Sequence, residues 1–327
     1  MTLLLKLPAV QKPPRCEQKN SRNCTTGGRR RGIAHLVGFL MFAVVGGAVG
    51  AAAHHPAQFA SGVNLVEVYA TVMDARGNRV AGLTAGDFSV SEDGEAQAIT
   101  TFVEGEFPLA VAVAIDRSFS MAGDRLALAK AAARTFLEGL KPGDQAMVLA
   151  VGSEVETAAP LSPDRAASRA AVDRLDAWGT TPLYDATLAA LDAIQAAKQR
   201  RALVLLSDGT DRYSRTSASA LLEEARRRDV LVYPVAIGGA RPPVFAELAA
   251  ATGGRSVFVK DARELRSTLA SIASELRQQY LLGYTPKHAG DASAAAPANA
   301  AGRWHAIQVR VARPNVRVRA RDGYYSK

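Results

Sequence analysis

The stretch Leu109-Ala-Val-Ala-Val-Ala-Ile115, followed by Asp116-Arg-Ser-Phe-Ser120, decides how this chain folds. The continuous apolar run predicts a strand that is buried on both faces, as in the centre of a parallel sheet. The polar residues begin where this strand ends. Ligands of open α/β sheets bind beyond the carboxyl ends of the strands. We therefore expect Asp116 to lie at the edge where a binding site forms.

Helices and strands alternate after this stretch. Helices are expected where apolar residues recur with helical spacing, at residues 126–140, 165–175, 183–197, 218–228, 244–251 and 262–279. Strands are expected where short apolar runs lie between them, at residues 146–151, 202–206, 230–237 and 256–259. This order predicts a doubly wound, mostly parallel α/β domain of the Rossmann-like kind over residues 108–280, with helices on both faces of its sheet.

Both flanks of that domain alternate apolar and polar residues, which is the period of a half-buried strand. The flanks are residues 63–106 and residues 281–327, and a loop rich in Ala, Gly, Ser and Pro, residues 287–302, interrupts the second one. Each flank is too short to bury a core alone. The two are therefore predicted to pair in a small β-sandwich-like module.

The last two strand patterns are joined by Pro314-Asn315, which is typical of a turn. We expect these strands to form a hairpin at the edge of a sheet. Three arginines alternate along the second strand, at Arg317, Arg319 and Arg321. We interpret these arginines as the solvated face of an edge hairpin, where charge discourages aggregation between sheets. An anionic partner is the alternative interpretation.

Most of the positive charge lies near the amino terminus. The net charge is +9, but residues 1–53 hold eight of the 40 Lys and Arg residues and one of the 31 Asp and Glu residues. The remaining residues hold 32 basic and 30 acidic side chains, a net charge of +2. A strongly basic domain is the usual electrostatic footprint of a nucleic-acid-binding protein. We therefore expect no nucleic-acid partner.

The amino-terminal residues resemble an export signal. Residues 1–32 form a basic n-region that contains Arg29-Arg30-Arg31, and residues 33–53 form an apolar run that ends in three alanines. This run of 21 residues is also long enough to span a bilayer. Cleavage after Ala53 and retention as a single membrane anchor both stay open. In either case the rest of the chain is expected outside the cytoplasm, as a periplasmic, secreted or outward-facing anchored protein.

Oxygen-bearing side chains follow the predicted strands 109–115 and 202–206 and precede the predicted helix 183–197. We expect all of them at the edge where the parallel strands end. These candidate metal ligands are Asp116, Ser118, Ser120, Thr181 and Asp208. Carboxylate and hydroxyl oxygens suit Mg²⁺ or Mn²⁺. Both cysteines, Cys16 and Cys24, lie in the leader, so a thiolate site is excluded from the exported part.

These segments resemble the metal-ion-dependent adhesion site of von Willebrand factor type A domains, whose motif is Asp-x-Ser-x-Ser, then a Thr, then an Asp. The segments here are Asp116-Arg-Ser-Phe-Ser120, Gly179-Thr-Thr181 and Ser207-Asp208-Gly209. The resemblance implies that the first Asp and both serines lie near the metal. It implies that Thr181 binds the metal directly or through water, and that Asp208 binds it through water. It also implies a non-enzymatic adhesion function, in which an Asp or Glu of a protein partner completes the metal's coordination.

The resemblance extends beyond the motif. Residues 80–88, 91–94, 279–286 and 319–325 are similar to segments of exported bacterial proteins of the von Willebrand type A-related group frequent in acidobacteria. This likeness covers residues 63–325. It implies an exported protein and supports the fold more than any activity.

Four further charged residues flank the candidate ligands. Asp185 is expected to stabilise the first turn of its helix, and Asp211 is expected to be a loop or cap residue. Arg117 and Arg212 either attract an acidic partner or form salt bridges with nearby acids.

Two other functions compete with adhesion. An Asp after a first buried strand, with Mg²⁺ and a later Asp, also describes metal-dependent phosphatases and phosphotransferases of the haloacid dehalogenase type. Those enzymes carry a second acid two residues after the nucleophile, where this chain has Ser118. The other alternative is a structural envelope protein in which the metal only stabilises the fold. A Walker-type loop is absent, so nucleotide hydrolysis has no support.

Overall fold

The computed structural model describes residues 65–238, 241–287 and 302–326, which belong to one compact unit of the chain. The n-region, the apolar run 33–53 and most of the loop 287–302 lie outside these residues, so the predictions made for them stay predictions. No helix within the described ranges is long and apolar enough to cross a membrane.

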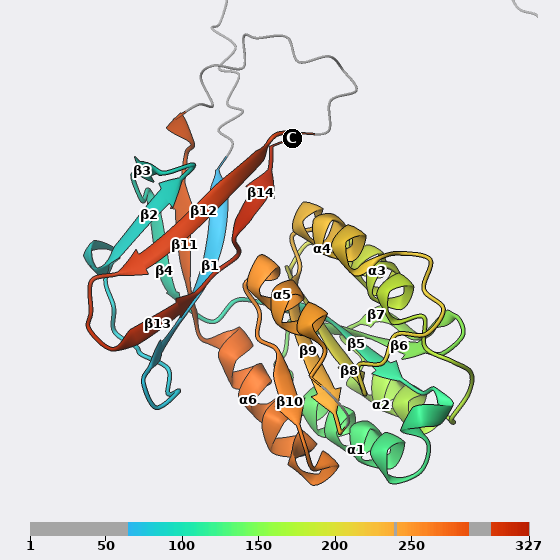
Figure 1. Cartoon of the computed structure of the whole chain (residues 1–327). Coiled ribbons are helices and arrows are strands. Elements are labelled where there is room, and N and C mark those ends of the chain that lie inside the picture. The colour runs from blue at the N-terminus through green and yellow to red at the C-terminus, as the bar shows by residue number, and fades with distance from the viewer. Residues whose placement is uncertain (1–64, 239–240, 288–301, 327) are drawn as a thin grey trace, which may run out of the picture. The chain divides into compact units, whose positions relative to one another are not determined.

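A six-stranded sheet forms the centre of the α/β domain (Figure 1). Its strands are β5 (Leu109–Asp116), β6 (Gln145–Val151), β7 (Val155–Ser162), β8 (Arg200–Ser207), β9 (Leu231–Ile237) and β10 (Val257–Val259). Their order across the sheet is β10-β9-β8-β5-β6-β7. All neighbouring strands run parallel except β6 and β7, which are antiparallel. The predicted fold class is confirmed.

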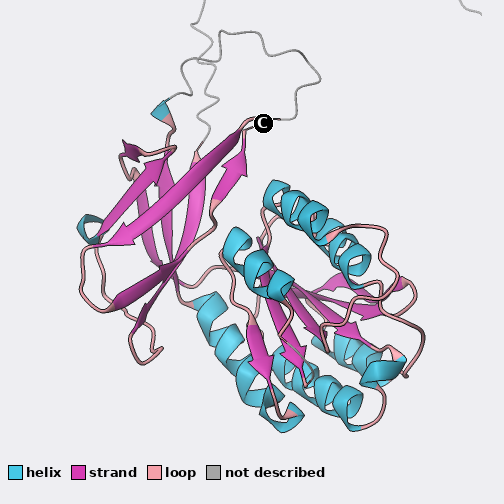
Figure 2. Ribbon diagram, in the orientation of Figure 1, coloured by secondary structure: helices cyan, strands magenta, loops and turns pink. Residues whose placement is uncertain are grey.

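Helices cover both faces of this sheet (Figure 2). The described α-helices are α1 (Asp124–Glu138), α2 (Arg165–Asp173), α3 (Leu183–Ala193), α4 (Ala218–Arg227), α5 (Pro243–Thr252) and α6 (Leu265–Arg277). Short 3₁₀ helices are η1 (Ala85–Asp87), η2 (Phe119–Met121) and η3 (Ala262–Glu264). Helices α1, α2 and α6 share one apolar core with the sheet, and α3, α4 and α5 share the other.

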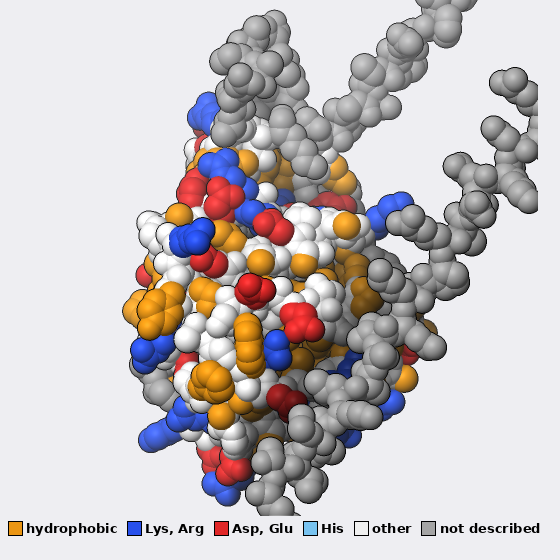
Figure 3. Space-filling model, turned by 90° about the vertical axis from the view of Figure 1, so that its right-hand side faces the viewer, with side chains coloured by type: hydrophobic (Ala, Val, Ile, Leu, Met, Phe, Trp, Pro, Cys, Tyr) orange, Lys and Arg blue, Asp and Glu red, His pale blue; other side chains and the backbone are white. Residues whose placement is uncertain are grey.

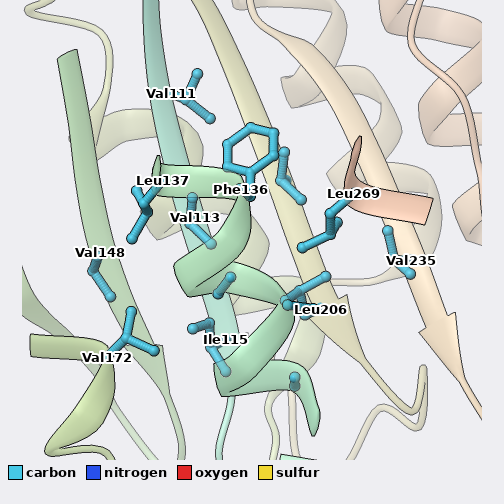
Figure 4. Packing of buried hydrophobic residues seen from close by; sticks show 14 of the residues in the cluster. Val111, Val113, Ile115, Phe136, Leu137, Val148, Val172, Leu206, Val235 and Leu269 are labelled. Atoms are coloured by element: carbon cyan, nitrogen blue, oxygen red, sulfur yellow. The ribbon is translucent and has the colours of Figure 1, made fainter. Parts of the chain in front are cut away.

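Strand β5 contributes to both cores because its side chains alternate between the two faces of the sheet. Val111, Val113 and Ile115 lie on the face that packs against α1, where Phe136 and Leu137 meet them (Figure 4). The alternate positions of β5 between them are alanines, which belong to the core shared with α3, α4 and α5. Every residue of β5 is buried. This strand therefore holds its position from both sides.

The two flanks of the domain form two four-stranded antiparallel sheets. The first flank supplies β1 (Val66–Asp74), β2 (Phe88–Glu92), β3 (Glu95–Gln97) and β4 (Thr101–Gly105). The second flank supplies β11 (Gln279–Tyr284), β12 (Trp304–Val311), β13 (Val316–Arg319) and β14 (Gly323–Tyr325). The sheet orders are β13-β1-β11-β4 and β14-β12-β2-β3, so each sheet contains strands from both flanks. One apolar core joins the two sheets, as a sandwich requires.

The predicted hairpin across Pro314-Asn315 is wrong. Strand β12 pairs with β2 and β14, whereas β13 pairs with β1 in the other sheet. Asn315 has a φ of 57°, and the turn that it makes carries the chain from one sheet to the other. Alternation shows which residues of each strand share a face, but it does not show which strand is the partner.

The interpretation of the carboxyl-terminal arginines as a solvated face is also wrong for two of them. Arg319 lies 2.8 Å from the carboxylate of Glu275, and Arg321 lies 3.3 Å from that of Asp229. Both acids belong to the α/β domain. β13 and the residues after it run past α6 and the start of β9. The two ion pairs therefore link the β module to that domain.

Other differences concern the edges of elements. Strand β7 was not predicted, because it contains Pro160 and leaves much of its length exposed at the end of the sheet. Helix α3 ends at Ala193 rather than at residue 197, and α6 ends at Arg277 rather than at residue 279. Gln279 instead begins β11.

Replacement of Glu275 by Ala should destabilise the protein strongly. The carboxylate of Glu275 is buried, accepts a hydrogen bond from the Tyr233 hydroxyl at 3.1 Å and pairs with Arg255 at 2.9 Å and with Arg319 at 2.8 Å. Removing it leaves two arginines without their counter-charge, so the free energy of unfolding should fall by about 3 kcal/mol. Urea denaturation would measure this loss.

The matched control is Glu138→Ala. Glu138 forms a 2.9 Å ion pair with Arg169 that is nearly half exposed on both sides. Its loss should cost less than about 1 kcal/mol, because solvent screens such pairs. Equal costs for the two variants would contradict the structural role given to Glu275.

Candidate metal site

Strands β5 and β8 bring two of the predicted ligands to the same edge of the sheet. The two strands pair in parallel, with Ile115 opposite Leu206. Asp116 is therefore the last residue of β5 beside Ser207, and Asp208 follows directly. Asp116 is fully buried and Asp208 is 7% exposed. The carboxyl ends of parallel strands thus place both acids where the sequence predicted them.

The Asp116 carboxylate is the centre of the site. Ser207 Oγ donates to its Oδ2 at 2.6 Å, and Thr181 Oγ1 donates to its two oxygens at 3.2 and 3.3 Å. The backbone N–H of Ser118 donates to Oδ1 at 2.9 Å. Side chains and backbone from three separate segments thus converge on one buried carboxylate.

The two motif serines belong to a single helical turn, with Ser118 as its N-cap and Ser120 inside it. Helix η2 begins at Phe119, directly after Ser118, and its Met121 is fully buried and anchors the turn in the core. The Ser118 and Ser120 hydroxyl oxygens are 3.1 Å apart. Ser118 is buried and Ser120 is exposed, so the pair extends from Asp116 toward the surface.

The loop that carries Thr181 is attached to the loop that follows β5. The N–H of Trp178 donates to the Arg117 carbonyl at 2.6 Å, and the N–H of Phe119 donates to the Gly179 carbonyl at 3.1 Å. These two backbone hydrogen bonds hold the loops side by side. They place the Thr181 hydroxyl beside Asp116.

Gly179 is required in this loop. Its φ is +80°, and a Cβ there would lie 2.6 Å from Ser153 Oγ. Two residues later, Thr181 is 2% exposed, and its carbonyl accepts the N–H of Arg212 at 2.7 Å. The loop after β8 is thereby fastened to the same threonine.

The third loop is ordered by its own backbone. The Asp208 carboxylate accepts the N–H of Thr210 at 2.9 Å. Gly209 has a φ of +80°, and a Cβ there would lie 2.2 Å from the Pro242 ring. A glycine is therefore needed after Asp208, which is where the motif has one.

Asp185 and Asp211 have structural roles, as expected. The Asp185 carboxylate accepts the N–H groups of Arg215 and Thr216 at 2.9 and 3.0 Å, and hydrogen bonds from the Thr216 side chain and from these N–H groups lower its pKa. Asp211 accepts the N–H of Tyr184 at the start of α3 at 3.3 Å. Both acids hold the loop after β8 against α3.

Of the two flanking arginines, Arg117 forms a salt bridge. Its guanidinium lies 2.9 Å from the Glu156 carboxylate and 5.3 Å from the ring centroid of Trp178. Arg212 is exposed in the loop after Asp208.

The electrostatics of the site favour a cation. Burial raises the pKa of Asp116, and the negative charge of Asp208 raises it further, while hydrogen bonds from Ser207 and Ser118 lower it. No Lys or Arg is among these main influences. A buried carboxylate without a counter-charge is costly. The oxygen donors and this uncompensated charge fit a hard divalent ion such as Mg²⁺.

The donor set also limits which metal fits. Across the described residues, no group of three or more His, Cys, Asp and Glu side chains has an arrangement that could hold a metal ion. The candidate site has two carboxylates, and its other donors are hydroxyls. Such a set is poor for zinc or copper and adequate for an ion that keeps several waters.

Some residues of this region were missed at the sequence level. Ser207 was not selected, although a hydroxyl at the end of a buried strand beside Asp208 was a usable signal. Three exposed aromatic residues were also missed: Phe119 is 67% exposed, Trp178 is 45% and Tyr213 is 79%. Each lies in one of the three loops that carry the candidate ligands.

Comparison with known proteins concerns the α/β domain. Residues 111–210 match the family model of the von Willebrand factor type A domain. A search of the curated proteins gives no match. The domain assignment therefore depends on the family model and on the architecture described above.

Solved structures with a similar fold have low sequence identity to the chain. BatB from Bacteroides thetaiotaomicron is 18% identical, with 51% of this chain and 97% of that one covered and a TM-score of 0.43. A von Willebrand factor type A protein from Catenulispora acidiphila is 16% identical, with 71% of each chain covered and a TM-score of 0.47. Proximal thread matrix protein 1 from the mussel byssus, with a zinc-occupied MIDAS motif, is 16% identical, with 57% and 49% covered and a TM-score of 0.48.

Ser207→Ala should destabilise the metal-free protein through Asp116. The variant loses a 2.6 Å hydrogen bond to a buried charge, so the free energy of unfolding at pH 7 in EDTA should fall by about 2 kcal/mol. In an Asp116→Asn background the same substitution should cost only about 1 kcal/mol, because the lost bond is then between neutral groups. Equal costs in the two backgrounds, measured by urea denaturation, would contradict the coupling.

Proposed function

Since the α/β domain of this chain is a von Willebrand factor type A domain, we propose that the protein is an exported, non-enzymatic binding module. In this proposal a divalent cation, Mg²⁺ or Mn²⁺, links the domain to an Asp or Glu side chain of a protein partner. Asp116, Ser118, Ser120 and Thr181 would hold the ion, and Asp208 would act through water. The ion supplies positive charge and an exchangeable position for the partner's carboxylate.

The observation that carries this proposal is the convergence of three loops on the uncompensated Asp116 carboxylate. The side chains of Ser207 and Thr181 both donate to it, and the Asp208 carboxylate lies close enough to raise its pKa. A fold that used Asp116 only as a cap would not need to bury two like charges next to each other. A bound cation removes that penalty.

Aromatic side chains around the site support a protein as partner. Five large hydrophobic residues are exposed in the described parts of the chain, and Phe119, Trp178 and Tyr213 are three of them. Aromatic residues are enriched in protein interfaces, where they act as anchors. Figure 3 shows exposed hydrophobic side chains next to acidic ones on the face that it draws. A partner that presents an acid to the ion and apolar side chains to these aromatic residues would fit the site.

No histidine of the described residues lies near the site, which supports a non-enzymatic role. His305 is the one histidine among the described residues; it lies in β12 of the β module and contacts Asp93 at 2.9 Å. Position 118, where a phosphatase of the competing class has its second acid, holds a serine whose hydroxyl contacts Ser120. Binding therefore agrees better with these residues than phosphoryl transfer does.

Export is part of the proposal because of the leader. The n-region and the apolar run 33–53 have the pattern of a signal or of a single anchor. A module outside the cytoplasm would meet its partner in the periplasm, in the medium or at the cell surface.

Mg²⁺ should stabilise the protein at the Asp116 site. At 100 times its Kd the ion should raise the free energy of unfolding by roughly 2.7 kcal/mol, because it binds the folded state only. Melting with Mg²⁺ and with EDTA would measure this gain. Asp116→Ala should abolish it, whereas Glu138→Ala, far along α1 on the surface, should retain it. Identical melting of wild type and Asp116→Ala under both conditions would reject the metal site.

Phe119→Ala and Tyr213→Asn should weaken partner binding without affecting the metal. Asn tolerates the positive φ of 70° at position 213, so the loop is retained. Each variant should keep the Mg²⁺ response of wild type and lose about tenfold in EDTA-reversible capture of a partner from the envelope of the source organism. Val103→Ala, which alters an exposed apolar residue of the β module, is the control. Capture that is unchanged in both aromatic variants would contradict an aromatic contact surface.

A further inference from the structure

A cavity lies at the opposite edge of the central sheet from the candidate metal site. Its volume is about 130 Å³, and Tyr69 of β1, Arg200 of β8 and Leu231 of β9 are among its lining residues. A single buried water needs about 10–15 Å³ on this measure, so the cavity has room for a small polyatomic ligand. Arg200 begins β8, whereas Ser207, the partner of Asp116, ends it. The cavity and the metal site are therefore separated by the length of one strand.

Arg200 is a buried cation that forms no ion pair with a carboxylate of the described residues. The residue is 9% exposed, and only its Nη1 has an acceptor, the Leu276 carbonyl at 2.8 Å. Its Nε and Nη2 are buried and have no hydrogen-bond acceptor. The Tyr69 ring stacks on the guanidinium, with 4.2 Å between Cζ and the ring centroid.

Burial lowers the pKa of Arg200 to about 10, so this side chain stays charged at neutral pH. Two donors and a full positive charge inside the protein are costly unless an acceptor satisfies them. The Asp229 and Glu275 carboxylates stabilise this charge from a distance, but neither accepts a hydrogen bond from the two free donors.

The other charges around the cavity leave it positive. Its lining includes four basic residues and two acidic ones. Arg201 and Arg321 both pair with Asp229, at 3.1 and 3.3 Å, so one carboxylate serves two guanidinium groups. The Nε of Arg321 is also buried without an acceptor. Lys198 is exposed at the rim. Orphan donors and excess positive charge together indicate an anion site.

We propose that this cavity binds a small oxyanion, a phosphate or a carboxylate, through the Arg200 guanidinium with help from Lys198. Planar guanidinium groups match the oxygens of both anions. The anion would contact the β module through the region of Tyr69 and Arg321, and the α/β domain through Arg200. Its binding would therefore strengthen the junction between the two.

The test uses the full chain in EDTA, so that the metal site does not contribute. Sodium phosphate and sodium acetate are titrated by calorimetry and in thermal melts, with NaCl at matched ionic strength as the reference. We expect a saturable rise in melting temperature with phosphate or acetate that NaCl does not reproduce. The anion that binds more tightly shows whether the site prefers a phosphate or a carboxylate. Equal melting in all three salts would overturn the proposal.

Variants connect the effect to the cavity. Lys198→Gln should raise the Kd about fivefold, the size expected for an exposed charge pair, and Lys260→Gln, outside the cavity, should not. Arg200→Met should abolish saturable binding. If Arg200→Met does not fold, Lys198→Gln decides alone, because its side chain is exposed. Wild-type affinity in Lys198→Gln would then overturn the assignment. Asp116→Ala should bind the anion normally, which separates this site from the proposed metal function.

Discussion

The parallel pairing of β5 with β8 is the constraint on which the rest of the structure depends. Because every residue of β5 is buried between two layers of helices, the strand cannot slide without exposing its apolar side chains. Its register against β8 then fixes Asp116 beside Ser207, and Asp208 follows at the same edge. The loop with Thr181 needs only to reach this edge, and two backbone hydrogen bonds to the loop after β5 hold it there.

Strand β8 connects two buried charged groups that form no ion pair within the described residues. It begins at the buried guanidinium of Arg200 and ends beside the buried carboxylate of Asp116. Other buried charges in the described parts of the chain are paired, as with Arg277 and Asp144 at 2.6 Å. Natural domains are only marginally stable, so an unpaired buried charge is a considerable cost. Both exceptions are explained if each group meets a ligand of opposite charge, a cation at one edge and an anion at the other.

The β module is fastened to the α/β domain by charged residues at the end of β13 and directly after it. Arg319 reaches Glu275 on α6, whose carboxylate also binds the hydroxyl of Tyr233 on β9. Asp322 in turn pairs with Arg226 of α4 at 3.0 Å. One carboxyl-terminal segment of the β module thus forms ion pairs with a helix from each of the two layers that cover the central sheet. A ligand at Arg200 would act on the same junction, because Tyr69 and Arg321 line that cavity.

The parts of the structure that the sequence predicts are those that local patterns determine. The apolar run at 109–115 and the polar residues after it predicted both the central strand and the place of Asp116, since burial on two faces and the end of a strand are visible in the order of residues. The loops that converge there could be predicted because each candidate ligand sits at the end of a recognisable element.

The remaining features depend on contacts between residues far apart in the chain. Arg200 precedes the strand predicted at 202–206 as an ordinary polar residue, and the structure shows that Tyr69, from the first flank, packs against its buried guanidinium. In the same way, alternation across Pro314-Asn315 predicted two strands but not that they join different sheets, because strand pairing is decided by the partner strands. A residue at the carboxyl end of a parallel strand can thus be assigned from local sequence, whereas a charge buried at a junction between modules becomes visible only when both modules are folded.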